Sequence, residues 1–295
     1  MKLKSQVPAS ERIYKAFVYL VLGILAVLIL VPVAWAFMAS VKETSEHYGS
    51  PWNLPTHIHW QNFVDAWNRA NMGGYMFNSI YVTATALGIL LLVALPASYC
   101  LARFKFVGQK FLNGCFMAGL FINVNYIVVP IYLMLSDGDK WLKQLLGDGF
   151  LLNNHLIVAV VYASTALPFT IYLLTSYFST LPHDFEEAAY MDGAGYTRTM
   201  LQVIFPMAKP AIITVILFNF LSFWNEYIII KTLVVQRDEW TLPAGLLNLM
   251  QAQQSAAEYG PMYAGLVMVM LPVLILYICV QKNLTKGMTV GGLKG

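Results

Sequence analysis

Several carboxylates of this 295-residue sequence gather in one polar stretch, residues 181–210, which lies between two strongly apolar segments. These carboxylates are Asp184, Glu186, Glu187 and Asp192. They alternate with alanines, glycines and aromatic residues, a mixture that suits a binding surface. Because short amphipathic helices are common at bilayer surfaces, the stretch has two interpretations, an interfacial loop and a docking element for another protein.

The order of residues within this stretch predicts two short helices separated by a glycine. Asp184 and Glu187 have the spacing of a capping box, in which each side chain bonds the other residue's backbone amide. Gly193 can adopt a positive φ and so end the first helix abruptly. Thr197 is expected to cap a second helix, which Pro206 would stop.

A second candidate for chemistry is Glu226, which falls inside an apolar segment directly after Trp224 and Asn225. A carboxylate within a membrane is costly and usually faces a cavity or a partner. In one interpretation Asn225 and Glu226, with Trp224, line a solute pathway. In the other, Glu226 lies near the outer interface beside Lys231 and anchors the helix end.

Motifs for catalysis are missing from the sequence. It has no phosphate-binding loop of the G-x-x-x-x-G-K-[ST] type, no H-E-x-x-H and no G-x-S-x-G. Cys100, Cys115 and Cys279 all lie in apolar segments, and His57 and His59 are too isolated to predict a metal site. We therefore expect no enzyme activity, no metal and no cofactor in this chain.

Composition predicts an all-α integral membrane protein. Hydrophobic residues make up 58% and charged residues 11% of the chain, whereas about a quarter of the residues in soluble domains are charged. The apolar segments long enough to cross a bilayer are residues 16–38, 76–102, 111–135, 155–178, 211–230 and 259–280. The net charge of +3 is too small to suggest nucleic-acid binding.

Lysine and arginine set the expected orientation of these six transmembrane helices. One side collects Lys2, Lys4, Arg12, Lys15, Arg103, Lys105, Lys110, Arg198, Lys209, Lys282, Lys286 and Lys294. The other side has half as many, namely Lys42, Arg69, Lys140, Lys143, Lys231 and Arg237. The positive-inside rule therefore places both termini and residues 181–210 in the cytoplasm.

The polar stretch resembles the EAA loop of ABC importer permeases. That family pattern is E-A-A, then a glycine after three residues, then I-x-L-P after nine more. Here Glu187, Ala188 and Ala189 are followed by Gly193 and Pro206, with Val203 and Phe205 at the two apolar positions. Further blocks are similar to carbohydrate permeases of the maltose-transporter type: residues 96–108, 224–227 and 241–246, and the glycine-rich tail. The tail resembles that of the second permease of that system.

The resemblance implies a type I ABC importer permease in a bacterial or archaeal cytoplasmic membrane. Its partners would be a second permease, an ATPase dimer that binds ATP and Mg, an extracytoplasmic solute-binding protein, a saccharide and membrane lipid. Residues 236–258 would touch the binding protein. The implied ATPase-coupling residues are Asp184, Glu186, Glu187, Ala188, Ala189, Asp192, Gly193 and Pro206, and Gly287, Gly291 and Gly292 of the tail would reach the ATPase dimer.

The expected organisation has three parts. Residues 1–75 hold the N-terminal tail, the first span and an external segment, residues 76–281 form the permease core around the loop 181–210, and residues 282–295 form a cytoplasmic tail. The alternative function is an ion-coupled secondary carrier. Such carriers usually show internal repeats and several intramembrane carboxylates, and this sequence has no repeat and one such carboxylate.

Overall fold

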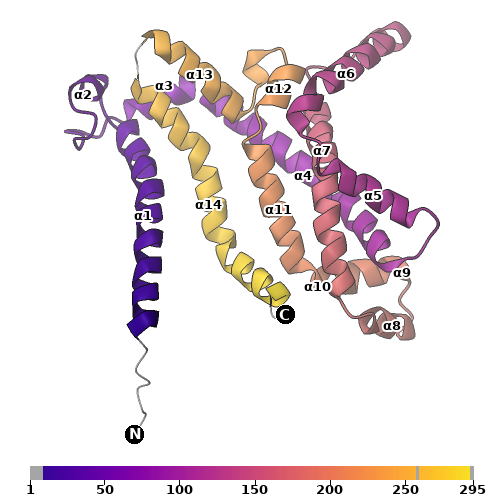
Figure 1. Ribbon diagram of the computed structural model, residues 1–295. Helices are drawn as coiled ribbons and strands as arrows, with labels where there is room; N and C mark the ends of the chain where they lie inside the picture. Colours follow the sequence, from indigo (N-terminus) through magenta and orange to yellow (C-terminus); the bar gives the residue numbers. More distant parts are fainter. Residues whose placement is uncertain (1–8, 257–258, 293–295) are drawn as a thin grey trace. The chain divides into compact units, whose positions relative to one another are not determined.

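The computed structural model describes the backbone of residues 9–256 and 259–292, and the side chains of residues 11–251 and 259–281. Every regular element in these ranges is a helix (Figure 1). Four of the described helices are long and apolar enough to cross a membrane unbroken: α1 (Ala9–Ser40), α4 (Met72–Arg103), α7 (His155–Thr180) and α14 (Tyr259–Gly292). The predicted all-α membrane fold is thus confirmed.

Two further spans are bent pairs of helices. Helices α5 (Gln109–Gly119) and α6 (Val124–Leu146) meet at 106°, so the predicted continuous segment 111–135 is broken in the structure. The Asn123 side chain accepts a hydrogen bond from the Asn125 amide at 2.9 Å, and this cap begins α6 as a separate helix. Counting each bent pair as one span gives up to six among the described residues, in line with the prediction.

The second bend precedes α11 (Lys209–Trp224). Residues Tyr196–Met207 turn into α11 through 76°, and after a break at residues 225–227 the chain continues as α12 (Ile228–Leu233). The predicted segment 211–230 therefore ends earlier, at Trp224. Beyond it lie a short turn at Arg237–Glu239 and α13 (Leu242–Ala256).

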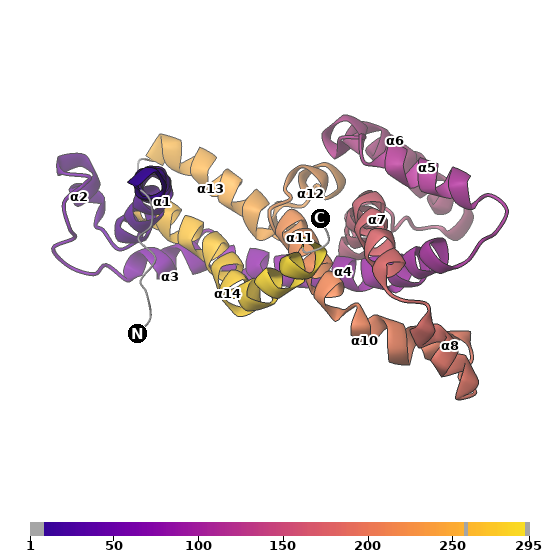
Figure 2. The ribbon, with the colours of Figure 1, turned by 60° about the horizontal axis from the view of Figure 1, so that its bottom comes forward.

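The chain forms two compact units, residues 1–70 with 249–268, and residues 71–248 with 269–295. In the second unit α4 packs along α7, with α11 beside both (Figure 2). Small residues let the two long helices approach each other closely: Ala86, Ala94, Ala159 and Ala163 are at most 2% exposed. This pair of helices forms the core of the second unit, and residues 181–210 follow directly after α7.

The first unit contains α1, α2 (Thr44–Gly49) and α3 (Gln61–Asn68). The Lys42 side chain is 1% exposed and donates to the carbonyl oxygens of Ser50 (3.3 Å) and Pro51 (2.8 Å). Asn62 donates to the carbonyl oxygens of Ser40 and Lys42, at 2.9 and 2.8 Å. These buried bonds stabilise the segment that follows α1.

Gly245 in α13 allows a close contact that a side chain would prevent. A Cβ atom there would collide with the ring of Tyr75, which is 4% exposed in the core. At Gly88 of α4, by contrast, a Cβ would meet nothing within 4 Å. We expect Gly245→Ala to lower the free energy of unfolding by about 1–3 kcal/mol, the usual cost of overpacking. Thermal unfolding in detergent, with Gly88→Ala as control, measures this, and equal midpoints would contradict it.

Candidate functional site

Residues 181–210 fold into a sequence of short helices at one end of α7. Helix α8 (Asp184–Met191) is followed by α9 (Tyr196–Thr199), a π-helical turn (Met200–Ile204) and α10 (Phe205–Met207). The predicted arrangement of helix, bend and helix is confirmed. We call residues 181–208 the α8 loop.

The predicted capping box at the start of α8 is wrong. The residue before the helix is His183, whose carbonyl oxygen accepts from the amides of Glu186 and Glu187 at 2.9 and 3.1 Å. Asp184 is therefore already the first helical residue, and it makes no cap. The three carboxylates of this first turn still stabilise α8 through the helix dipole, because negative charge is favourable at a helix N-terminus.

Gly193 ends α8 as predicted. Its φ is +80°, and the amide of Ala194 donates to the carbonyl oxygen of Ala189 at 2.9 Å across the turn. A Cβ at Gly193 would meet nothing within 4 Å, so it is the backbone conformation and not crowding that favours glycine. Gly195, two residues later, is in an extended conformation with a φ of −78°.

The second part of the α8 loop differs from its prediction. Helix α9 begins at Tyr196 after Gly195, so Thr197 is not its cap. Pro206 does not stop the helix either, since α10 includes it and ends at Met207. Ahead of Pro206 the amide of Phe205 bonds to the carbonyl oxygen of Met200, a π-type bond. The helix is wider at this turn, directly before Pro206, which has no backbone N–H to donate.

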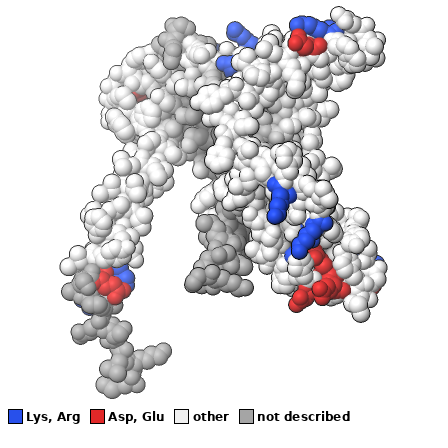
Figure 3. All heavy atoms as spheres, turned by 45° about the vertical axis from the view of Figure 1, so that its right-hand side comes forward, with Lys and Arg blue, Asp and Glu red and all other residues white. Residues whose placement is uncertain are grey.

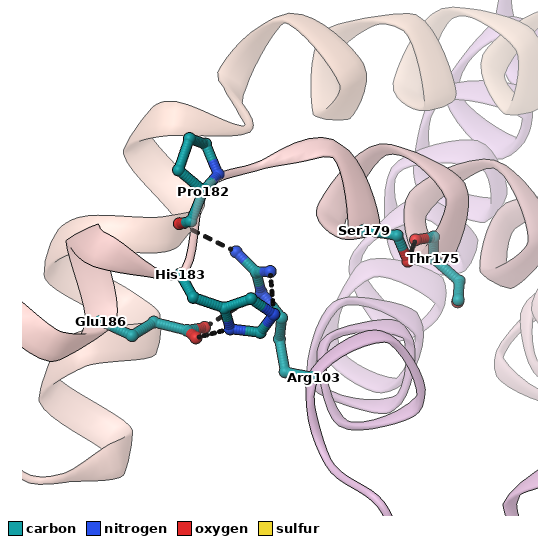
Figure 4. Close-up of polar contacts among 6 residues, drawn as sticks. All are labelled: Arg103, Thr175, Ser179, Pro182, His183 and Glu186. Carbon is teal, nitrogen blue, oxygen red and sulfur yellow. Dashed lines mark hydrogen bonds and ion pairs between the residues drawn. The ribbon is translucent and has the colours of Figure 1, made fainter.

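A buried ion pair joins the α8 loop to the end of α4 (Figure 4). Arg103, the last residue of α4, places Nε 3.1 Å from Oε1 of Glu186, and the two side chains are 2% and 8% exposed. His183 Nδ1 lies 3.2 Å from the second Glu186 oxygen, and His183 Nε2 lies 3.3 Å from Arg103 Nη1. In the sequence Arg103 is an orientation signal and part of the block 96–108, but its pairing with Glu186 could not be predicted, because no spacing rule links residues 83 positions apart.

Aromatic rings hold the α8 loop against the same helix ends. Tyr99 of α4 contacts Phe178 of α7 edge-on, with ring centroids 6.0 Å apart, and Phe178 stacks on Phe205 at 6.0 Å. Tyr196 contacts Phe104 at 5.7 Å and Tyr190 at 5.4 Å. Partial burial and the nearby Glu186 charge raise the pKa of Tyr190, because both disfavour a charged phenolate.

The opposite face of α8 is open. Glu187, Ala188, Asp192 and Gly193 are exposed, and Met191 is 89% exposed, whereas Ala189 faces inward at 8%. In Figure 3 acidic side chains form a red patch at the end of the unit that carries α8, with basic side chains nearby. An exposed methionine and alanine beside carboxylates form a surface suited to a partner with an apolar groove and positive charge. Pro206 is exposed as well.

A cavity of about 460 Å³ lies among α6, α7, α11 and α12. Its polar lining consists of Asn125, Tyr162, Thr165, Asn219, Ser222 and Glu226, and its apolar lining includes Phe169, Phe218 and Phe223. Aromatic faces together with a few hydroxyl and amide groups are typical of small-molecule sites.

Glu226 lines this cavity and also fixes the start of α12. Its carboxylate accepts from the Tyr162 hydroxyl at 2.8 Å and from the amides of Ile228 and Ile229 at 2.8 and 3.0 Å. Glu226 thus both lines a cavity and anchors a helix start, while its role in a solute pathway stays a prediction. Lys231 is not its partner, since its ammonium group lies over the Trp240 ring, 5.0 Å from the centroid.

The other two predicted pathway residues do not line the cavity. Trp224 is 2% exposed, and its Nε1 donates to the carbonyl oxygen of Val269 at 3.1 Å. The Asn225 side chain donates to the carbonyl oxygen of Leu221 at 2.8 Å. The cavity residues Tyr162, Thr165 and Ser222 were not predicted, because single hydroxyls in apolar helices give no sequence signal of their own.

The predicted tail glycines Gly287, Gly291 and Gly292 fall in the last turns of α14, and their surroundings lie outside the described residues. Within the part of the chain whose side chains are described, no three histidine, cysteine, aspartate or glutamate residues are placed to hold a metal ion.

Comparison with known proteins identifies the class. Residues 94–290 match the family "Binding-protein-dependent transport system inner membrane component". A diacetylchitobiose uptake permease of Streptomyces coelicolor is 35% identical over 98% of this chain and 92% of its own length. A multiple sugar-binding transport permease of Streptococcus mutans is 29% identical over 97% and 99%.

A solved structure agrees with this assignment. A chain of a bacterial ABC transporter that imports the acidic polysaccharide alginate superimposes with a TM-score of 0.78 at 25% identity, covering 95% of this chain and 99% of that one. The protein described here belongs to the binding-protein-dependent permease family, whose members are membrane-embedded transport subunits and not enzymes. The resemblance to ABC importer permeases is confirmed, and the ion-coupled carrier gains no support.

Proposed function

We propose that this chain is one of two permease subunits of an ATP-driven importer for saccharides, and that α8 couples it to the ATPase subunits. The observation that carries the proposal is α8 itself, a helix held on one face by buried contacts and open on the other. A short helix fixed in this way can receive a displacement and pass it to the spans. The uptake systems named for the relatives support the substrate class.

The division of labour among subunits follows from this proposal. ATP and Mg would bind on a separate ATPase dimer, since the sequence has no phosphate-binding loop of its own. An extracytoplasmic binding protein would deliver the saccharide, and residues 236–258 would contact it. Both termini would lie in the cytoplasm of a bacterial or archaeal cell, as the distribution of lysine and arginine indicates.

Co-purification tests the proposal. Tagged chain expressed with its candidate second permease and ATPase is expected to bring both down in fixed proportion. The purified complex should hydrolyse ATP faster when a saccharide-loaded binding protein is added. A chain that purifies without any ATPase, under conditions that keep the second permease bound, would overturn the assignment.

The cavity beside Glu226 is the part of the solute path that this chain would contribute. Glu226→Gln keeps the side-chain size but removes the negative charge of the carboxylate, which accepts hydrogen bonds from Tyr162 and two amides. Because a hydrogen bond to a charged group contributes about 1.5–3 kcal/mol, we expect uptake to fall about tenfold or more. Radiolabelled uptake at matched complex levels measures this.

The matched control is Glu11→Gln, which removes an exposed carboxylate paired with Lys15 near the start of α1. Exposed pairs of this kind contribute little, so the control should transport normally. Unchanged saccharide affinity and flux in Glu226→Gln would remove this cavity from the path.

A further inference from the structure

The ion pair between Arg103 and Glu186 stands apart from the others in the described chain. Four ion pairs with lysine or arginine join residues three or four positions apart, within a helix or at its end, and in each at least one side chain is more than half exposed. The Arg103–Glu186 pair instead joins two different helices and is buried on both sides. Burying two charges costs desolvation energy, and removing one partner leaves the other charge buried and unpaired. A pair of this kind therefore favours one fixed position of α8 relative to α4.

The covalent connections of α8 are poorly suited to transmit a movement. Toward α7 the chain passes through the non-helical residues Leu181 and Pro182. Toward α11 it passes through the bend at Gly193, a π turn and the 76° bend. A displacement of α8 would be absorbed at these joints, unless contacts through space carry it.

Arg103 provides that contact. It belongs to α4, which packs along α7 through the core of the unit. Besides Glu186 it faces His183 and the carbonyl oxygen of Pro182, 3.4 Å from Nη2, so it meets α8 and its entry together. The side chains of Tyr99 and Tyr190 lie near the Glu186 carboxylate. Among the described residues no lysine or arginine other than Arg103 forms an ion pair with Glu186.

We propose that the Arg103–Glu186 pair is the rigid link through which α8 moves α4, which makes Arg103 and Glu186 positioning residues for energy coupling. The proposal rests on the proposed coupling function of α8. It assigns opposite roles to adjacent carboxylates, since Glu187 faces outward to the partner while Glu186 faces inward to α4. Loss of the link should leave ATPase binding in place and separate ATP hydrolysis from transport.

The test uses the complete complex with second permease, ATPase and binding protein, reconstituted in vesicles. Three variants are compared with the parent chain: Arg103→Glu, Glu186→Gln and the charge exchange Arg103→Glu with Glu186→Arg. Glu186→Gln is nearly isosteric, so it covers the case in which the charge reversal fails to fold. Lys105→Glu, a reversal at an exposed position two residues from Arg103, is the control. ATPase bound per permease, ATP hydrolysed and solute taken up are measured together.

We expect both single variants to bind ATPase within about twofold of the parent but to take up at least tenfold less solute per ATP hydrolysed. The charge exchange should recover most of that ratio, a result that simple destabilisation would not give. The link is refuted if the single variants keep the parent ratio, or if the exchange recovers nothing. Failure of the parent complex to bind ATPase would instead refute the function of α8, and the link with it.

Discussion

Gly193→Asp is expected to abolish coupled uptake while leaving the chain in the membrane. The backbone at Gly193 has a φ of +80°, where a side chain costs about 1–2 kcal/mol. The new carboxylate would also lie beside Asp192 on the exposed face proposed to meet the ATPase. Strain tilts the end of α8, and the added carboxylate repels that of Asp192, so both effects disturb the shape of the docking surface. Uptake and ATPase binding by the purified complex measure the loss, expected to exceed about tenfold.

The pair Gly193→Ala and Gly195→Ala separates backbone strain from charge. A Cβ at either glycine would meet nothing within 4 Å, so the two substitutions differ mainly in φ, +80° against −78°. Gly193→Ala should lower coupled uptake severalfold and Gly195→Ala should leave it unchanged. Equal activity in this pair, together with normal ATPase binding by Gly193→Asp, would show that the end of α8 does not position a docking surface.

Glu187→Arg is expected to release the ATPase from the complex. Glu187 is exposed and makes no ion pair among the described residues, so little in the fold itself depends on its charge. Reversing charge in the first helical turn costs about 0.3–1 kcal/mol through the helix dipole, too little to unfold a domain. A positive side chain facing a positively charged partner costs several kcal/mol and would prevent binding. The ATPase recovered with tagged permease is the measurement.

Asp137→Arg provides the control for that reversal, because Asp137 is 75% exposed and, among the described residues, forms an ion pair only with Lys140 in α6. The permease level in the membrane should be the same for both variants. If Glu187→Arg retained the ATPase and its stimulation by the binding protein, then the outward face of α8 would not be the contact surface.

Local signals in the sequence predicted local features well. The apolar segments gave the helices, and the glycine at 193 gave the positive φ, because few other residues adopt it. The capping box failed because the chain enters α8 one residue earlier, with His183 at the cap position and with Glu186 turned toward Arg103. A tertiary contact decided the orientation of that carboxylate, and a local spacing rule cannot include it.

Other features depend on contacts between distant residues and so escaped prediction. The break at residues 120–123 lies beside Gly119, where Pro168 of α7 packs so closely that a Cβ would come within 2.8 Å of its ring. Glu226 was recognised as unusual, but its bonds to Tyr162 and to the start of α12 could not be read from spacing. The sequence thus indicated the α8 loop and Glu226, while their contacts with distant residues became visible only in the structure.

Transport by vesicles of defined composition tests the central claim most directly. Vesicles containing this chain, its second permease and the ATPase are expected to accumulate saccharide only when ATP and the loaded binding protein are both supplied. Leaving out the ATPase should reduce accumulation to the level of empty vesicles, whatever ion gradient is imposed. Accumulation driven by a proton or sodium gradient in vesicles that contain this chain alone would contradict the account.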